Sequence, residues 1–246
     1  MREFLPTFLL AAALVGCSSD SDSAPVDDGM IRVTPADIGD SWLVNDTRAG
    51  GTVSIAADSF GPRPLGDGSL QLSTTDTQGG SGQAKAQLYY YGYGSLGDPL
   101  AGVALSDLTA LAYTAYRDAT STNPAAQTVS LNIEVDFVGD GTSYTTLVFE
   151  PIYNTDQGAI QPGTWQRWDA FNGGQAVWWS TRAIPGAPSN SFVALQTIID
   201  NNPNAKIIYG VGFSAGSGWT GDFFGAVDAL EVGISGETVT YDFEPQ

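Results

Sequence analysis

Two acidic residues, Glu134 and Asp136, stand two positions apart where apolar and polar residues alternate without a break. From Val129 to Phe137 every odd position is apolar and every even position is polar, the pattern of a strand with one buried face. Both carboxylates therefore project from the polar face, and Glu150 could join them from the end of the next predicted strand. Carboxylates of this kind can hydrolyse glycosidic bonds by acid and base catalysis. The stronger interpretation is a solvated strand face without chemistry.

The chain has no histidine, and its one cysteine is Cys17. These facts exclude Ser-His and Cys-His nucleophiles as well as zinc and iron sites with nitrogen or sulfur ligands. Any bound metal should be Ca²⁺ or Mg²⁺, held by oxygen atoms. An enzyme would have to work with carboxylates, Tyr, Lys or Arg, and no disulfide can form within one chain.

Tryptophans are the other residues with a recognisable chemistry. Trp179 lies in a segment rich in Gly, Asn and Gln, and Trp219 lies in a loop-like, glycine-rich stretch. Aromatic rings stack on the apolar face of a sugar while amides and carboxylates bind its hydroxyls. We expect these two rings, with Tyr90, to bind a neutral polysaccharide. Trp168 and Trp178 have the position of strand residues that face the core.

The elements that must position these residues are mainly short strands. Runs rich in Val, Ile, Thr and Tyr alternate with Gly, Pro, Asn and Asp clusters, which is typical of an all-β domain. The predicted strands are residues 52–55, 69–73, 84–91, 109–116, 129–137, 144–150, 206–213, 223–234 and 238–243. Residues 136–143 are predicted as a hairpin turn rather than a calcium loop.

One short helix is predicted over residues 191–202. Phe192, Leu195, Ile198 and Ile199 would share its apolar face, with caps in residues 189–191 and an end at residues 201–203. Many strands and one surface helix favour a two-sheet jelly-roll sandwich over residues 30–246.

The charge of the chain is strongly negative. It has 9 Lys and Arg against 27 Asp and Glu, a net charge of −18, which opposes binding to nucleic acid and to anionic headgroups. The same charge should repel acidic glycans, so neutral ones are the better candidates. High solubility is the simpler interpretation of the acidity.

Several segments of the domain resemble those of exported bacterial surface proteins. An aromatic-Gly-x-Val-Asp strand followed by Tyr-Asp-Phe-Glu is similar to the closing strands of jelly-roll carbohydrate-binding modules. The segments that carry the resemblance are residues 66–70, 86–91, 218–219, 225–233 and 240–244. The resemblance implies a non-catalytic sugar-binding domain and a structural calcium ion at Asp228. The alternative for Asp228 is a buried carboxylate that caps backbone amides.

A second resemblance concerns catalysis. Retaining β-glucanases of the concanavalin-like jelly roll carry Glu-x-Asp-x-x-Glu on one strand, and Glu134 and Asp136 match the first two positions. The last glutamate is missing, because positions 138 and 139 are Val and Gly. Three classes therefore remain: a sugar-binding domain, which we favour, a carboxylate-based glycosidase and a structural or adhesive surface protein.

The amino terminus has the features of an export signal. Met1 and Arg2 precede an apolar stretch that is too short to span a bilayer. Leu-Val-Gly-Cys at residues 14–17 resembles the lipobox of bacterial lipoproteins, which implies a signal peptide at residues 1–16 and lipid on Cys17. Residues 17–29 are predicted to be a flexible tether. Ser18 after the cysteine implies delivery to the outer membrane of a Gram-negative cell.

Anchoring through Cys17 can be tested directly. In Cys17→Ser the acyl acceptor is lost, so we expect no incorporation of labelled palmitate and either an unprocessed or a released protein. Metabolic labelling and membrane fractionation measure both effects. Labelling that persists in the variant would show that the thiol is not the lipid site.

Overall fold

The computed structural model describes residues 29–57, 60–75, 82–90, 100 and 102–246. Within them the chain forms two seven-stranded sheets. Sheet A contains β1 (Met30–Val33), β3 (Gly51–Ala57), β4 (Gly68–Thr74), β6 (Leu108–Arg117), β9 (Trp165–Asp169), β13 (Phe223–Ile234) and β14 (Glu237–Phe243). Sheet B contains β2 (Trp42–Leu43), β5 (Lys85–Tyr90), β7 (Ser130–Asp136), β8 (Tyr144–Phe149), β10 (Val177–Ser180), β11 (Val193–Ala194) and β12 (Lys206–Gly216).

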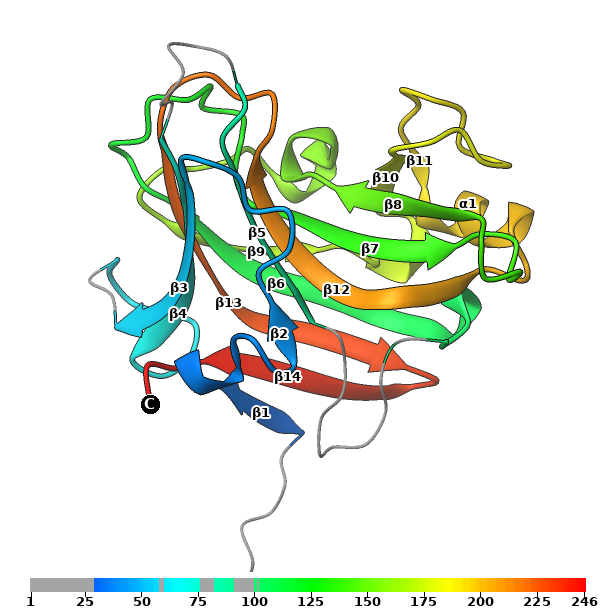
Figure 1. Ribbon diagram of the computed structural model, residues 1–246, viewed down its shortest axis with the longest axis horizontal. Helices are drawn as coiled ribbons and strands as arrows, with labels where there is room; N and C mark the ends of the chain where they lie inside the picture. The colour runs from blue at the N-terminus through cyan, green and yellow to red at the C-terminus, as the bar shows by residue number, and fades with distance from the viewer. Residues whose placement is uncertain (1–28, 58–59, 76–81, 91–99, 101) are drawn as a thin grey trace, which may run out of the picture.

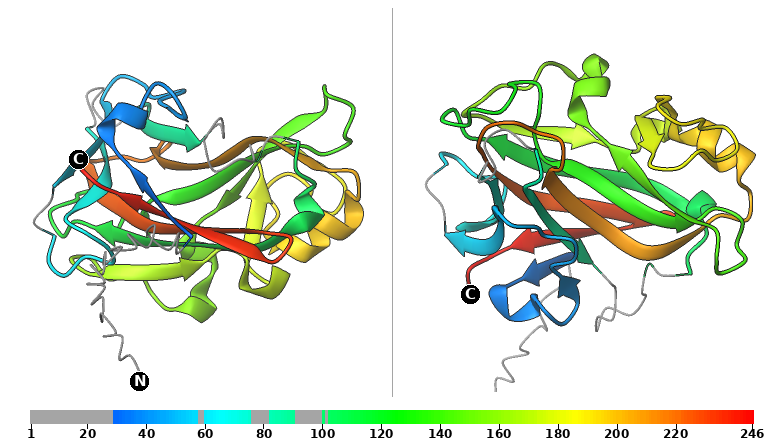
Figure 2. Two further views of the ribbon diagram at one scale, coloured as in Figure 1. Left: turned by 90° about the horizontal axis from the view of Figure 1, so that it is seen from below. Right: turned by 45° about the horizontal axis from the view of Figure 1, so that its top comes forward.

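The two sheets pack face to face as a sandwich (Figures 1 and 2). In sheet B the order is β11-β10-β8-β7-β12-β5-β2, and in sheet A the long strand β13 pairs with β6 on one side and with β4 and β14 on the other. From β4 to β7 the chain passes from one sheet to the other at every step, as in a jelly roll. The predicted all-β sandwich is confirmed, and all nine predicted strands are present within a few residues.

A series of ring contacts joins the two sheets through the core. Neighbouring ring centroids lie 5.0–6.3 Å apart, within the range of favourable aromatic pairs. We call this series the aromatic seam, and its members are Trp178, Phe149, Tyr113, Phe213, Phe243, Trp42 and Tyr90. The buried hydroxyl of Tyr113 donates to the carbonyl of Val129 at 2.8 Å, so the seam leaves that polar group satisfied.

The strands of sheet B alternate between the core and the outer surface as predicted. On β7, Leu131, Ile133 and Val135 are fully buried, and the polar residues between them point away from sheet A. The same alternation separates Trp178, which is buried in the core, from Trp179, which is only partly buried. The outer face of sheet B is therefore the face that carries the candidate functional residues.

The helix differs from the prediction. It is α1 (Leu195–Asn201), preceded by strand β11 rather than by a longer helix, and its cap position Ala194 has no side-chain hydrogen bond. Leu195, Ile198 and Ile199 are buried as expected. Phe192 is wrong as a helical core residue, because it precedes β11 and lies exposed. The helix lies at one end of the sandwich and the carboxy terminus at the other (Figure 1).

The predicted signal peptide, the lipid site Cys17 and the tether up to residue 28 lie outside the described residues. Within the described part of the chain, every helix is too short or too polar to cross a membrane.

Arg117 at the end of β6 holds the loop that leads to β7. Its side chain is buried, and its guanidinium donates to the carbonyls of Gln127 at 3.0 Å, Asp118 at 3.1 Å and Asn123 at 2.8 Å. A further bond of 2.8 Å joins it to Oδ1 of Asn123. One cation thus bonds three carbonyls of the loop, of which that of Asp118 also accepts from the amide of Ser121 at 3.2 Å.

Removing this cation should destabilise the protein. For Arg117→Met we expect the free energy of unfolding to fall by about 2–4 kcal/mol, because the carbonyls lose a charged donor. Arg167→Met is the matched control, since Arg167 forms an exposed ion pair with Glu231 and should cost less than about 1 kcal/mol. Urea denaturation measures both variants, and equal losses would contradict the role of Arg117.

Candidate functional site

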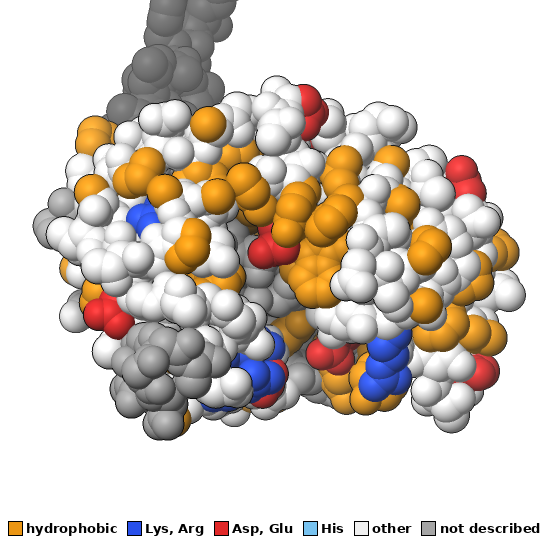
Figure 3. Space-filling view, turned by 90° about the horizontal axis from the view of Figure 1, so that it is seen from above, with side chains coloured by type: hydrophobic (Ala, Val, Ile, Leu, Met, Phe, Trp, Pro, Cys, Tyr) orange, Lys and Arg blue, Asp and Glu red, His pale blue; other side chains and the backbone are white. Residues whose placement is uncertain are grey.

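A groove of about 560 Å³ runs over the outer face of sheet B. Its floor comes from the outward positions of β5, β7, β8, β10 and β12, and its wall comes from residues 45–48 and the loop after β12. The space-filling view shows a hollow whose margin carries hydrophobic, acidic and basic side chains (Figure 3). Trp179, Trp219, Glu134 and Glu150 all line the groove.

The register of the strands sets the direction of the floor. Trp179 lies opposite Val148, Val148 opposite Asn132, Asn132 opposite Gly212, and Gly212 opposite Tyr89. These five residues form one row that crosses the strands, with an aromatic ring at each end and an amide in the middle. A linear ligand would lie along this row.

Gly212 makes room for the ring of Tyr89. A Cβ atom at position 212 would lie 2.3 Å from Cδ1 of Tyr89, closer than nonbonded carbon atoms approach. Tyr90, expected to bind a ligand, is instead 7% exposed and packs on Trp42 in the aromatic seam. Strand alternation turns residue 90 inward, and Tyr89 is the tyrosine of β5 that lines the groove, with only 2% of it exposed.

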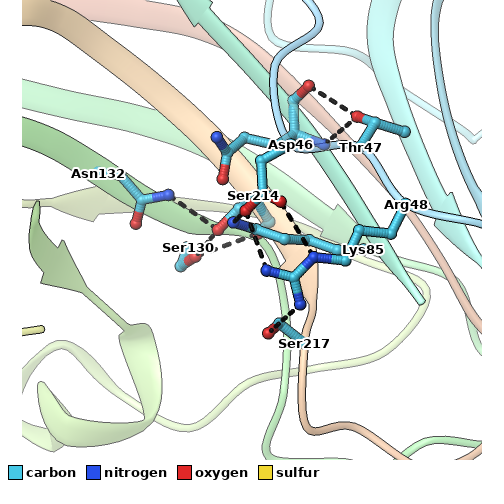
Figure 4. A network of polar contacts seen from close by, with 9 residues as sticks. Asp46, Thr47, Arg48, Lys85, Ser130, Asn132, Ser214 and Ser217 are labelled. Carbon is cyan, nitrogen blue, oxygen red and sulfur yellow. Dashed lines mark hydrogen bonds and ion pairs between the residues drawn. The ribbon is translucent and has the colours of Figure 1, made fainter. Parts of the chain in front are cut away.

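A small polar cluster occupies the centre of the floor (Figure 4). Nδ2 of Asn132 donates to Oγ of Ser214 at 2.8 Å, and Ser130 and Ser214 join their hydroxyls at 2.8 Å. Asn132 is only 3% exposed, and its Oδ1 has no donor among the described residues. A buried acceptor without a donor is costly, and because this oxygen is itself buried, a ligand could reach it only if the side chains around it moved.

One wall of the groove is an ion cluster that the sequence did not indicate. The carboxylate of Asp46 accepts from Arg48 at 3.0 Å and 3.1 Å and from Lys85 at 2.7 Å, and Arg48 also donates to Ser217 at 3.2 Å (Figure 4). Arg48 and then Lys85 lower the pKa of Asp46 against the opposing effect of burial. The two cations thus share one carboxylate, so one of the two positive charges is balanced within the wall.

Trp179 is held in place by a carboxylate. Its Nε1 donates to Oε2 of Glu150 at 2.8 Å, which fixes the plane of the indole ring. Burial raises the pKa of Glu150, while the bond from Trp179 acts in the opposite direction. The other predicted ring, Trp219, is half-buried and meets Phe223 edge to face with centroids 5.3 Å apart. Both rings are present in the groove with restricted orientations.

Glu134 and Glu150 share the groove but do not face one another. Glu134 lies opposite Thr146, so Glu150 is four residues further along the neighbouring strand, a backbone offset of roughly 13 Å. Retaining hydrolysis needs carboxyl groups about 5 Å apart, and inverting hydrolysis about 6.5–9.5 Å. Burial raises the pKa of Glu134, Lys85 lowers it and Asp46 raises it. The side chains would have to lean far toward each other to act on one bond.

Asp136, grouped with Glu134 from the sequence, has a different role. Its carboxylate accepts from the amides of Val138, Gly139 and Gly141 at 2.6–3.2 Å. The residue is buried and does not line the groove. It closes the hairpin turn between β7 and β8, which the sequence predicted as a turn.

Asp228, expected as a calcium ligand, lies on β13 in sheet A and is fully buried. Its Oδ2 accepts from the amide of Leu65 at 3.0 Å, and its Oδ1 accepts from the amide of Phe243 at 3.3 Å. Amide donors on both oxygens do not suit a cation, which needs oxygen ligands there. Capping of backbone amides, the alternative left open, fits these contacts. Within the described residues no group of three or more His, Cys, Asp or Glu is placed to hold a metal.

Sequence reasoning missed most of the polar groove residues. Asn132 and Ser130 stand on the same alternating face as Glu134, so the pattern that located the carboxylate could have located them. Asp46 and Lys85 are far apart in the chain, and no local signal pairs them.

No family model matches the chain, and no curated protein matches it. What the chain does must therefore be inferred from the groove.

The raised pKa of Asp228 predicts how the stability of the fold depends on pH. Burial raises the pKa of Asp228 to about 7, from the ordinary value of 3.8, against the opposing amides of Ala229, Phe243 and Leu65. Between these two values the folded chain keeps a proton that the unfolded chain has lost. The stability that this proton contributes is therefore complete below about pH 4 and is lost as the pH rises through about 7.

Asp228→Asn removes this titration. We expect the cost of the substitution, measured as the free energy of unfolding in urea, to be largest near pH 4 and to shrink by about 2–4 kcal/mol toward pH 7. Glu237→Gln, at an exposed position of β14, is the control and should show little change. A cost for Asp228→Asn that is constant over this range would refute the assignment.

Proposed function

We propose that this chain binds a neutral polysaccharide in the groove of sheet B without cleaving it. The observation that carries the proposal is the groove itself, in which Trp179 and Trp219 lie together with the polar side chains of the floor. Hydroxyl, amide and carboxylate groups of the floor are suited to the hydroxyls of a sugar. Trp179 and Trp219 would stack on the apolar faces of pyranose rings.

The charges in the groove support a neutral ligand. Arg48 and Lys85 are engaged by Asp46, and Glu134 and Glu150 add negative charge that an acidic glycan would meet. Binding through stacking and neutral hydrogen bonds should depend little on salt, because no ion pair forms with the ligand.

Hydrolysis is the second candidate, since Glu134 and Glu150 line the same groove and burial raises the pKa of each. A carboxyl group with a raised pKa can serve as a general acid. The offset between the two residues favours binding. A structural or adhesive surface role remains as the third class, and it makes no use of the groove.

The proposed setting is the cell surface. After removal of a signal peptide at residues 1–16, lipid on Cys17 would anchor the domain at the membrane. The groove would take no part in this anchoring, because its acidic residues oppose anionic headgroups. The lipobox resemblance supports an outer-membrane location, and the net charge of −18 argues against nucleic-acid partners.

Affinity electrophoresis through gels that contain neutral glucans, xylans or galactans tests the proposal. We expect one of these to retard the wild type, with little effect of added salt. Trp179→Ala and Trp219→Ala should weaken binding by about 1–3 kcal/mol each, because each removes a stacking ring. Trp165→Ala, which removes a ring from sheet A outside the groove, is the control.

Two outcomes separate the classes. No retardation by any neutral glycan would refute the binding function and favour a structural role. Reducing ends that accumulate with the wild type but not with Glu134→Gln would identify an enzyme instead.

A further inference from the structure

An exposed pair of aromatic rings lies beside the edge of sheet B. Tyr153 is 42% exposed and Phe192 is 45% exposed, and their ring centroids are 3.9 Å apart. They come from separate segments, the short 3-10 helix Pro151–Tyr153 after β8 and the residue before β11. Two large apolar side chains in mutual contact on the surface need an explanation, because single exposed ones are common but clusters mark binding sites.

The end of β11 brings Phe192 to the side of the sheet on which Trp179 lies. Trp178 lies opposite Val193, and Phe192 directly precedes Val193, just outside β11. Directly opposed residues of antiparallel strands share a face. Val193 packs against the core beneath Trp178, and Phe192 therefore lies on the outer face with Trp179.

Tyr153 is related to the Trp179 end of the groove through Glu150. It follows Glu150 by three residues, and Glu150 accepts the indole proton of Trp179 at 2.8 Å. Burial raises the pKa of Tyr153, and the charge of Glu150 raises it further. Both members of the pair thus belong to the surroundings of Trp179.

We propose that Tyr153 and Phe192 form an outer subsite, in which a long neutral glycan continues past Trp179 over the edge of sheet B. This inference rests on the proposed function. The groove reaches from β5 to β10, and with β11 at the edge these six strands span about 24 Å at the usual strand spacing. The ligand class is therefore a linear chain of several sugars, bound across the strands, rather than a monosaccharide or a chain end.

The subsite predicts a dependence on chain length. Calorimetry with neutral oligosaccharides from disaccharide to hexasaccharide, taken from the polysaccharide that retards the wild type, measures the affinity of each length. For Phe192→Ala and Tyr153→Ala we expect the hexasaccharide to bind about five- to tenfold more weakly, since each removes an aromatic contact. The disaccharide should bind as it does to the wild type, because it fills only the central row.

Phe224→Ala is the matched control, since Phe224 is 41% exposed and lies on β13 of sheet A. It should leave every affinity unchanged. Equal affinities of Phe192→Ala and the wild type for the hexasaccharide would overturn the subsite and leave the binding function intact. A wild type that binds no oligosaccharide or polysaccharide would overturn both. Sedimentation tests whether a second copy of this chain covers the ring pair instead. A wild-type dimer that dissociates in the Phe192→Ala variant would assign the pair to self-association and overturn the subsite.

Discussion

The packing of sheet B on sheet A through the aromatic seam is the constraint on which the groove depends. Each strand of sheet B must give every second side chain to that core, and Trp178 and Phe149 supply it at the β10 and β8 positions. The residues between them are excluded from the core by the same pleat. Trp179 and Asn132 are therefore turned outward by strands whose positions the core holds fixed, which leaves the groove little freedom to rearrange.

Side chains that are already ordered would lower the free-energy cost of binding a ligand that interacts weakly. Ordering a side chain on binding costs free energy, and here Glu150 already holds the indole of Trp179 while Ser214 holds the amide of Asn132. Gly212 contributes by leaving the space that the ring of Tyr89 fills. The groove is thus shaped before any ligand arrives, and the unmet acceptor of Asn132 is the cost of that arrangement.

The sequence predicted the fold better than the site, for physical reasons. Alternation is local, so β7 could be located and Trp178 assigned to the core. The face on which Tyr90 lies could not be predicted, because a run of tyrosines shows no alternation of polarity that would indicate which rings point inward. The wall formed by Asp46 and Lys85 depends on contacts between distant segments, and the amides on Asp228 come from Leu65 and Phe243, far away in the chain. Such pairings have no signature in one sequence.

The pairing of β1 has a mechanical consequence. β1 runs parallel to β14, with Met30 opposite Thr240 and Val33 opposite Phe243, so the amino-terminal strand of the described domain is fastened along its length to the carboxy-terminal one. A pull on the chain that precedes Gly29, directed along the strand, would load the hydrogen bonds of this ladder together in shear rather than open them one at a time. A domain that is tethered from its amino terminus and bound to a fixed polymer would carry tension through this ladder, and four residues of parallel strand would bear it first.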